Sequence, residues 1–302
     1  MPLSCLSMKI LVTGANSFVG SHVLESLALQ GHEVVGTYRR HNERVNNLVN
    51  NLLVPVIQLD LSCVDDFKRL PSDFEAVVHN AGSFPWVDVD INNVVQCNVL
   101  GTLNLCNWLK RQNSITRIVT YSTLSVYGNI VDQFLTEDTP ANSYEIYGSS
   151  KLASEHLISQ LEGYESQLII RFPIVLGNHA HRAFIPRMVE SFQTNSPIKI
   201  TNPNKLYNSM TTLKAVANFT NYYLISDLND KHIANIGAEE PLTVLQIAEF
   251  LRACLKSKSA ISINNVETNC YLIDNTVAIN LGYQAPTVQE ALNYYSTESG
   301  WV

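Results

Sequence analysis

The chain of 302 residues has 46% hydrophobic and 16% charged residues, a composition typical of a folded protein that buries a sizeable core. Its 20 basic and 27 acidic residues give a net charge of −7 without a basic cluster, which excludes nucleic acid as an expected partner. No apolar run approaches the roughly 20 residues that span a bilayer, and the six cysteines lack Cys-x-x-Cys spacing, so no membrane span, zinc site or disulfide framework is expected. Cysteine usage of this kind favours a cytoplasmic location.

Segments rich in Val and Ile recur along the first part of the chain, separated by segments of helix length. They are residues 9–14, 33–38, 54–60, 76–82, 117–122 and 167–173. Strands that are apolar throughout, with helices between them, are typical of a parallel sheet covered on both faces. We therefore predict an α/β fold whose first domain, residues 1–173, is a Rossmann-type doubly wound parallel sheet.

Other segments have patterns of their own. Residues 90–112 carry apolar side chains at helical spacing and end in basic residues, as a helix C-terminus favours. The asparagine-rich residues 42–51 predict an exposed short helix or loop. After residue 173 the elements become shorter and mixed, which predicts a smaller C-terminal α/β cap over residues 174–302, with segments that return to the first domain. The predicted cap elements are residues 184–193, 197–200, 232–237 and 243–255.

The segment "TGANSFVG" forms a tight turn between the first predicted strand and the first helix. Dinucleotide-binding folds place a glycine-spaced loop here, where backbone N–H groups and the helix N-terminus face a pyrophosphate. Gly14 and Gly20 hold the outer positions, whereas Ser17 takes the middle one. Serine is small, and its hydroxyl can bond a phosphate or cap the helix, so Ser17 weakens the motif without cancelling it.

Tyr147 and Lys151 in "YGSSK" are four residues apart at the start of a helical pattern, so both side chains project from one helix face. An ammonium beside a phenol stabilises the phenolate and moves a pKa of about 10 towards proton transfer at neutral pH. The spacing alone is weak evidence, since such pairs on exposed helices usually have no function. Upstream, however, a strand end carries the hydroxyls of Ser122 and Thr123, where a sheet of this type opens its ligand crevice.

Several motifs together resemble those of the extended short-chain dehydrogenases/reductases, in the NAD-dependent epimerase/dehydratase family. They are "TGANSFVG", "LDL", "HNAG", "NVLGTLNL", "STLSVYG" and "YGSSKLASE", and the later "NIGAEEPLTVLQIAEFL" is most similar to the cap of the sugar-nucleotide branch. The resemblance implies that Tyr147 is the catalytic acid/base, that Lys151 lowers the pKa of Tyr147 and holds the cofactor ribose, and that Thr123 hydrogen-bonds the reacting substrate oxygen. It also implies a nucleotide-sugar substrate and a homodimer.

A set of residues is expected to contact the cofactor on the same grounds. They are Gly14, Asn16, Ser17, Phe18, Val19, Gly20, Arg39, Asp60, Leu61, Asn80, Ala81, Gly82, Asn98, Tyr147, Lys151, Phe172 and Pro173. Asp60, expected near the adenine, is alternatively a turn former that ends a strand, and Asn98 is alternatively an ordinary polar residue on a buried helix. His79 is expected to be structural, whereas His179 and His181 are candidates for the substrate cleft. No metal is expected, because no carboxylate or cysteine cluster accompanies these histidines.

The end of the second strand, "VVGTYRR", lacks the acidic residue that NAD-binding members use for the ribose hydroxyls. Arg39 follows the strand instead, as in NADP-binding relatives, where a guanidinium pairs with the 2′-phosphate. NADP is therefore favoured over NAD as the cofactor. The simple alternative is that Arg39 and Arg40 are two solvated loop charges.

Two further positions depart from the family pattern for binding the phosphates of a nucleotide sugar. An asparagine after the sixth strand is replaced by Ile174, and an arginine near the return to the first domain is replaced by Asn208. These departures weaken the assignment of a nucleotide sugar. Candidates to bind the phosphates in their place are Lys205, Arg182 and Arg187.

The leading hypothesis is an NADP-preferring oxidoreductase that epimerises or reduces a keto group of a nucleotide-linked sugar. Leu124 and Ser125 stand where the family's 4,6-dehydratases carry the Asp-Glu pair that removes water, so dehydration is disfavoured. An NADPH-dependent reductase of a non-sugar carbonyl compound is the alternative within enzymes, since flavonoid and aldehyde reductases share "TYRR"-like strand ends. A cofactor-sensing binding protein without turnover is the alternative from another class, which intact Thr123, Tyr147 and Lys151 disfavour.

Overall fold

The computed structural model describes residues 7–84, 90–181, 183–266 and 270–302. The chain divides into two compact units, which we describe separately. The first comprises residues 1–128, 140–171 and 216–234, and the second comprises residues 129–139, 172–215 and 235–302. Among the described residues, no helix has the length and apolar character needed to cross a membrane.

The first unit is built on a seven-stranded sheet of order β12-β7-β5-β4-β1-β2-β3. Neighbours β1 and β2, β2 and β3, β1 and β4, and β4 and β5 are parallel, with Leu11 of β1 opposite Val35 of β2 and Val77 of β4. The strands are β1 Lys9–Thr13, β2 Glu33–Tyr38, β3 Val56–Gln58, β4 Ala76–His79, β5 Arg117–Thr123, β7 Ser166–Phe172 and β12 Asp230–Asn235. The strand order reverses at β1 and β4, which is where such sheets bind ligands at their carboxyl edge.

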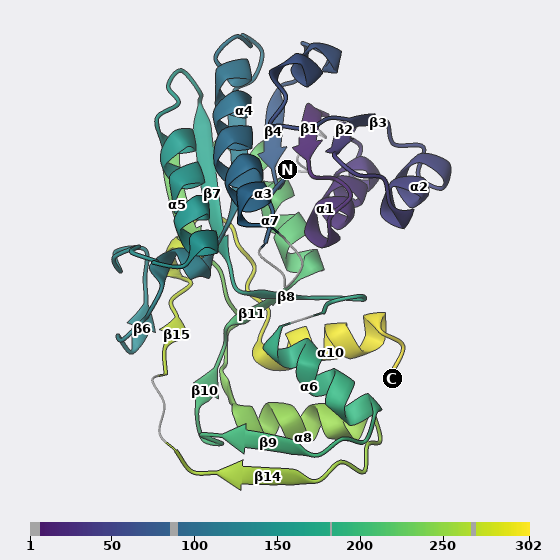
Figure 1. Ribbon diagram of the computed structural model, residues 1–302, viewed down its shortest axis with the longest axis vertical. Coiled ribbons are helices and arrows are strands. Elements are labelled where there is room, and N and C mark those ends of the chain that lie inside the picture. Colours follow the sequence, from purple (N-terminus) through teal and green to yellow (C-terminus); the bar gives the residue numbers. More distant parts are fainter. Residues whose placement is uncertain (1–6, 85–89, 182, 267–269) are drawn as a thin grey trace. The chain divides into compact units, whose positions relative to one another are not determined.

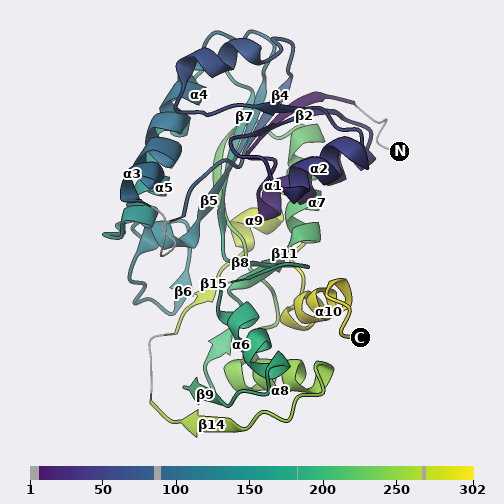
Figure 2. The ribbon, with the colours of Figure 1, turned by 45° about the vertical axis from the view of Figure 1, so that its right-hand side comes forward.

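Helices cover both faces of this sheet, with α4 and α5 on one face and α1 and α7 on the other (Figure 2). The helices are α1 Phe18–Leu29, α2 Glu43–Asn50, α3 Ile91–Val95, α4 Gly101–Leu109, α5 Ile146–Ser159 and α7 Leu213–Ile225, with a π-helical turn Gln96–Leu100 and 3-10 turns Val64–Arg69 and Leu124–Tyr127. Strand residues Leu11 and Ile118 are 0% exposed and pack in one cluster with Leu105 of α4 and Ile158 of α5. The prediction of an α/β Rossmann-type fold is therefore confirmed.

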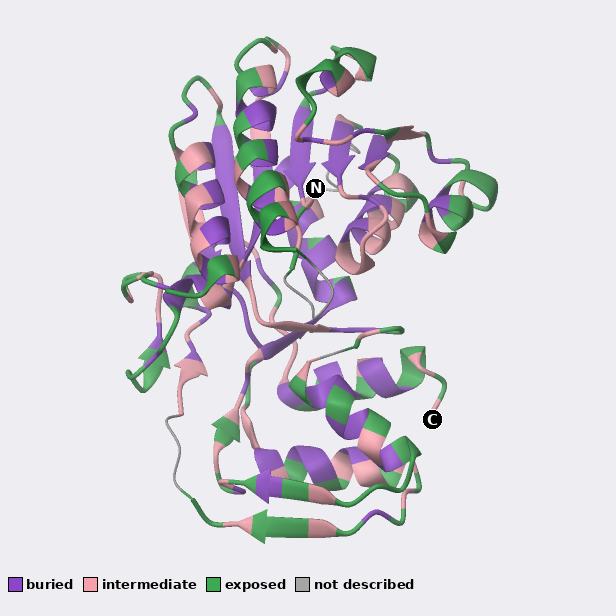
Figure 3. Ribbon diagram, viewed as in Figure 1, coloured by how far each residue is buried: buried purple, intermediate pink, exposed green. Residues whose placement is uncertain are grey.

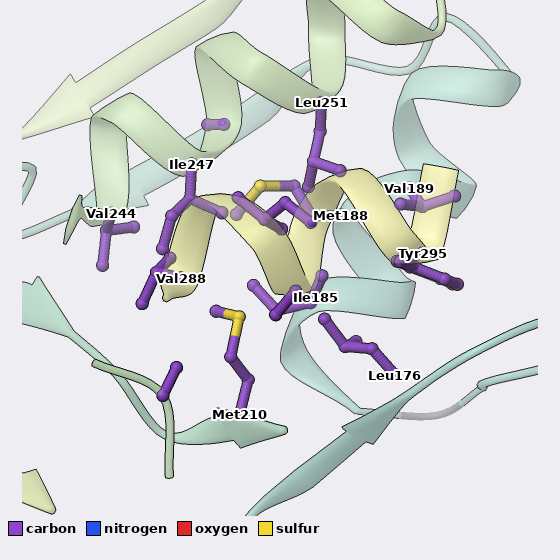
Figure 4. Close-up of a cluster of buried hydrophobic side chains, with 14 of the residues drawn as sticks. Leu176, Ile185, Met188, Val189, Met210, Val244, Ile247, Leu251, Val288 and Tyr295 are labelled. Atoms are coloured by element: carbon purple, nitrogen blue, oxygen red, sulfur yellow. The ribbon is translucent and has the colours of Figure 1, made fainter. Parts of the chain in front are cut away.

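The second unit combines short strand pairs with helices α6, α8, α9 and α10 (Figure 1). Its elements are β6 Phe134–Leu135, β8 Ile174–Leu176, α6 Phe184–Gln193, β9 Ile198–Thr201, β10 Leu206–Tyr207, β11 Met210–Thr212, β13 Leu242–Thr243, α8 Val244–Cys254, β14 Ile261–Asn264, β15 Leu272–Ile273, α9 Thr276–Asn280 and α10 Val288–Glu298. Strands β9 and β14 are parallel, as are β8 and β11, and β6 and β15. Figure 4 shows the core, where Met188 of α6, Ile247 of α8 and Val288 of α10 converge.

Two details differ from the sequence expectations. Residues 232–237 were expected in the cap, but most of them form β12, the edge strand of the first unit's sheet. The boundary expected at residue 173 lies after Arg171, and residues 129–139 belong to the second unit. The exposed short helix expected within residues 42–51 is α2, Glu43–Asn50; most of its residues are exposed, but Val45 and Leu48 are buried. Each difference depends on packing partners that are distant in the sequence.

Burial follows this layering within each unit (Figure 3). The strands of the first unit are largely buried, whereas its helices alternate between buried and exposed residues along their length. Polar side chains stand at the carboxyl ends of β1, β4 and β5, where Thr13 and His79 are buried and Thr123 is half-buried.

Candidate active site

The loop between β1 and α1 needs glycine at its two outer positions. Gly14 has a φ of +69°, and a Cβ there would lie 2.7 Å from the Cα of Ala81. A Cβ on Gly20 would overlap the carbonyl oxygen of Gly14 and the side-chain nitrogen of Asn80. Helix α1 thus begins close against the end of β4, and its N-terminus opens towards the carboxyl edge of the sheet.

Ser17 does not need to be glycine, because its φ of −83° and ψ of 169° are ordinary extended backbone. Its hydroxyl oxygen accepts a hydrogen bond from Gly20 N at 3.0 Å, which makes it the N-cap of α1. The same oxygen accepts a hydrogen bond from Asn80 Nδ2 at 2.8 Å. Serine at this position therefore stabilises both the helix start and the contact with β4.

His79 lies at the end of β4 between two hydroxyl groups. Its ring nitrogens lie 2.8 Å from Thr13 Oγ1 and 3.0 Å from Thr102 Oγ1. Burial lowers its pKa to about 3, with a smaller contribution from the charge of Lys151, so the imidazole is neutral at physiological pH. His79 is thus a buried, hydrogen-bonded residue of the sheet.

A cavity of about 240 Å³ lies beside this loop in the first unit. Its lining residues are Gly14, Asn16, Ser17, Thr37, Tyr38, Arg39, Arg40, Leu59, Asp60, Leu61, Ala81, Gly82 and Cys97. Asp60 is the acidic member of this set, whereas Arg39 and Arg40 are both basic. The carboxylate of Asp60 also accepts hydrogen bonds from Ser62 N at 2.9 Å and Ser62 Oγ at 2.7 Å, so it closes a turn and lines the cavity at once.

The structure does not gather every predicted cofactor residue at this cavity. Phe18 and Val19 open α1 and are half-buried, and Asn80 acts from behind the loop through its hydrogen bonds. Phe172 and Pro173 belong to the second unit and are not among the residues of this cavity.

Asn98 lies in the π-helical turn before α4 and is 1% exposed. Its side chain accepts a hydrogen bond from Ser83 N at 2.7 Å and donates to Ser83 O and to Ser150 Oγ, both at 2.9 Å. A Cβ on Gly82 would lie 3.5 Å from Asn98 Oδ1. The amide therefore joins the segment after β4 to helix α5 next to the cavity wall.

Helix α5 carries Tyr147 and Lys151. Lys151 is 5% exposed and donates a hydrogen bond from Nζ to the backbone oxygen of Tyr121 at 2.7 Å. Burial raises the pKa of Tyr147 from its ordinary value of 10 to about 12, and a hydrogen bond with Thr123 opposes this shift. The hydroxyl groups of Thr123 and Tyr147 thus meet, and Lys151 lies one helical turn away.

Some residues of the site were missed by sequence reasoning. Phe84 packs against Tyr147 with ring centroids 4.4 Å apart, and Cys97 lines the cavity. Glu155 and Arg171 form a buried ion pair with an N–O distance of 2.6 Å. The position of Glu155, four residues after Lys151 in "YGSSKLASE", was a usable signal, whereas no local pattern marked the others.

The position after Thr123 holds no acid or base that could remove water. Leu124 is 7% exposed, and the Ser125 hydroxyl lies 3.2 Å from Thr123 Oγ1, from which it accepts a hydrogen bond. The backbone N–H of Ser125 donates to Thr123 Oγ1 at 3.1 Å, which fixes Thr123 as the cap of the following turn.

The second unit has a cavity of its own, of about 480 Å³. Its lining residues are Phe184, Arg187, Met188, Ser191, Ile198, Lys199, Ile200, Thr201, Lys205, Tyr207 and Val244. Arg187 and Lys205, named above as candidates for phosphate binding, both line it, and the Phe184 and Tyr207 rings lie 5.6 Å apart. Arg182 lies outside the described residues.

Asn208 and Ile174 are structural residues of the second unit. The Asn208 amide donates to Ala238 O at 3.0 Å and Ile273 O at 2.9 Å, and it accepts from Ile273 N at 2.9 Å. Ile174 packs against the hydrophobic core. Neither residue is among those that line the 480 Å³ cavity.

The remaining histidine candidates lie elsewhere in the second unit. His179 and His181 line a separate cavity of about 550 Å³. The described residues contain no group of three or more His, Cys, Asp or Glu side chains arranged to hold a metal ion.

The sheet, the glycine-spaced loop and the Thr123, Tyr147 and Lys151 side chains define a dinucleotide-binding protein of the extended short-chain dehydrogenase/reductase type. The sequence profile of the NAD dependent epimerase/dehydratase family matches residues 10–213, and the chain belongs to this family. The resemblance to this family is therefore confirmed.

Among curated relatives, the UDP-glucose 4-epimerase of Neisseria meningitidis serogroup C is 29% identical over 185 residues, which are 57% of this chain and 54% of that protein. The chain thus aligns with about half the length of that relative. The UDP-glucuronate 4-epimerase of Thermodesulfobacterium geofontis is 26% identical over 273 residues, covering 82% of this chain and 81% of the relative.

Among solved structures, the UDP-glucuronic acid 4-epimerase of Bacillus cereus in complex with NAD superimposes with a TM-score of 0.79 at 23% identity. The superposition covers 97% of this chain and 99% of that one. This similarity supports the fold.

Proposed function

We propose that the protein is an NADP-dependent oxidoreductase that epimerises or reduces the keto position of a nucleotide sugar. The observation that carries the proposal is that the Thr123 hydroxyl, at the end of β5, meets the Tyr147 hydroxyl of α5, the helix that also carries Lys151. Family membership and relatives named as UDP-sugar 4-epimerases support the substrate class. In this proposal the first unit binds the cofactor and the second unit binds the nucleotide.

The residues around the 240 Å³ cavity fit a dinucleotide. Gly14, Asn16 and Ser17 of the loop line this cavity, and α1 begins beside it with its N-terminal N–H groups. Asp60 is placed for the adenine or its ribose, and Arg39 for a 2′-phosphate. When bound, a nicotinamide dinucleotide supplies the acceptor or donor of a hydride.

Tyr147 is proposed to move the proton at the substrate oxygen. Burial keeps its phenol protonated at neutral pH, which suits donation to a carbonyl oxygen in the reductive direction. In the oxidative direction the phenol must lose its proton, and the ammonium of Lys151 offsets the cost of that charge. Thr123 is proposed to orient the oxygen, because its hydroxyl lies within hydrogen-bond distance of the Tyr147 hydroxyl.

The 480 Å³ cavity of the second unit is proposed to hold the nucleotide part of the substrate. Arg187, Lys199 and Lys205 bring positive charge for a diphosphate, and Phe184 and Tyr207 offer aromatic faces for a base. Its apolar residues Met188, Ile198, Ile200 and Val244 also favour the alternative, an NADPH-dependent reductase of a non-sugar carbonyl compound. A cofactor-sensing protein without turnover remains the alternative from another class.

UDP-sugars together with NADPH should raise the melting temperature more than the matching free sugars do. Ligand at 100 times its Kd stabilises the native state by about 2.7 kcal/mol, a shift of several degrees. Arg187→Ala should reduce this shift, whereas the exposed Lys258→Ala in the same unit should not. Mass spectrometry should detect no 4-keto-6-deoxy sugar. If small aldehydes or ketones raise the melting temperature and nucleotide sugars do not, the result would instead support the carbonyl reductase.

Arg39 should make NADPH bind more tightly than NADH. Loss of one charge-assisted contact with the 2′-phosphate costs about 1.5–3 kcal/mol, so Arg39→Ala should weaken NADPH binding roughly 10- to 100-fold and leave NADH nearly unchanged. Calorimetric titration of both cofactors against both proteins measures this difference. Equal affinities for the two cofactors in the unaltered protein would show that Arg39 is a solvated surface charge.

Tyr147→Phe should fold and bind cofactor normally but lose at least about 100-fold in kcat, because only the acid/base hydroxyl is removed. Lys151→Met should lower both kcat and cofactor affinity, since the residue is assigned to the ribose and to Tyr147. Thr123→Val should lower kcat alone. Steady-state kinetics on an identified substrate checks these effects, and near-normal turnover by Tyr147→Phe would assign the proton transfer to another residue.

The exposed face of α3 and α4 suggests a homodimer. Ile91, Val95, Leu100 and Leu103 are between 39% and 58% exposed along this helical segment, and α4 packs beside α5. A stripe of large apolar side chains on one helix face is typical of an interaction surface. We therefore expect twice the mass of the chain in light scattering and a shift towards monomer in Leu100→Glu/Leu103→Glu.

A further inference from the structure

Three charged side chains lie buried together in the first unit. Lys151 is 5% exposed, Glu155 is 2% exposed and Arg171 is 5% exposed. Lys151 and Glu155 are four residues apart on α5, so they share one face of the helix. Arg171, at the end of β7, approaches Glu155 with Nη2 at 2.6 Å from Oε2 and Nε at 3.1 Å from Oε1.

The carboxylate of Glu155 is fully engaged by donors. Besides the Arg171 guanidinium, the hydroxyl of Ser122 donates to Oε1. Arg171 in turn donates from Nη1 to the Tyr127 hydroxyl at 2.7 Å and lies 4.8 Å from the centre of its ring. Since both carboxylate oxygens accept hydrogen bonds, Glu155 is not available as a proton-transfer group itself.

The surroundings of Lys151 make Glu155 its principal negative neighbour. Tyr147 and Glu155 face it from α5, Cys97 from the π-helical turn and His79 from the end of β4. Burial lowers the pKa of Lys151, and the charges of Glu155 and then Cys97 raise it. His79 is neutral, and burial raises the pKa of the Cys97 thiol, which leaves the carboxylate that pairs with Arg171 as the negative neighbour of Lys151.

Glu155 also ties helix α5 to strand β5, which ends at Thr123. Ser122, its hydrogen-bond donor, directly precedes Thr123 in β5. Lys151 bonds to Tyr121 O in the same strand at 2.7 Å. The two side chains therefore hold α5 against β5 at successive helical turns.

We propose that Glu155, paired with Arg171, is a positioning residue that keeps Lys151 in its ammonium form and directed along β5. This rests on the role proposed above for Lys151 in binding the cofactor ribose and assisting Tyr147. Arg171 supplies the counter-charge that allows a carboxylate to remain in this dry environment. A purely structural ion pair would stabilise the same fold without influencing the charge of Lys151.

The test removes the pair as a whole, because losing one partner would leave an unpaired buried charge. The double variant Glu155→Met/Arg171→Met removes one negative and one positive charge. Glu155 lies on the same helix face as Lys151 and raises its pKa, whereas Arg171 lies on β7 and is not among the charges that shift this pKa. The pKa of Lys151 should therefore fall, and its ammonium should disappear as the pH rises. NADPH affinity, measured by fluorescence titration between pH 7 and 9.5, should weaken by roughly 10-fold or more over this range beyond any change in the unaltered protein. Arg69→Met, which breaks an exposed ion pair with Asp66, is the matched control and should follow the unaltered protein.

Adding Lys151→Met to the double variant should remove the extra pH dependence, because no ammonium is left to titrate. A folded double variant that keeps the unaltered pH profile would overturn the proposal and leave the ion pair a purely structural element. If Lys151→Met alone binds NADPH normally at every pH, the role of Lys151 in the proposed function fails instead.

A direct measurement covers the case in which the double variant does not fold. In the unaltered protein with ¹³Cε-labelled lysines, the NMR signal that is missing from Lys151→Met identifies Lys151. The proposal requires this signal to remain that of a charged amine up to pH 9. Deprotonation below pH 8 would contradict it.

Discussion

One side-chain amide holds the cofactor end of the first unit together. Asn80 Nδ2 donates to Gly14 O at 2.9 Å and to Ser17 Oγ at 2.8 Å, while Asn80 N bonds to Thr13 Oγ1 at 3.2 Å. The end of β1, the start of α1 and the end of β4 therefore cannot move independently. Because the amide satisfies the loop from behind, the loop backbone on the other side remains open to a ligand. Gly14 and Ser17, which line the 240 Å³ cavity, are held in place by this contact.

Burial has opposing effects on the proposed proton-transfer chemistry of Tyr147. Packing of Phe84 against Tyr147 and enclosure of the phenol make deprotonation harder, as the raised pKa of Tyr147 shows. The same enclosure strengthens any charge placed nearby, since fewer waters screen it. The ammonium of Lys151, one helical turn from Tyr147, therefore stabilises a phenolate more strongly here than it would on an exposed helix. The buried charge of Lys151 in turn needs a buried partner of opposite charge.

Sequence patterns predicted those features that are set locally. Runs of apolar residues located the parallel strands, because a strand covered on both faces has no polar side, and the strand from Glu33 to Tyr38 matches its predicted range. The site motifs were visible because Tyr147 and Lys151 are neighbours on one helix. By contrast, Glu155 and Arg171 meet only after β7 joins the sheet, and β12 had no local sign of which sheet it would join. The role of Asn208 could not be predicted either. It follows β10, and its amide bonds to backbone groups of Ala238 and Ile273 that are distant in the sequence, whereas its neighbour Tyr207 lines the cavity.

The division into two units has a consequence for how this protein can be dissected. The chain passes from one unit to the other at residues 128–129, 139–140, 171–172, 215–216 and 234–235. Neither unit is a continuous stretch of sequence, so no single truncation yields either one intact. A fragment ending near residue 173 would lack α7 and β12, leaving part of one sheet face uncovered and β7 as an open edge. Exchange of either unit between relatives therefore requires several coordinated crossovers rather than the swap of one segment.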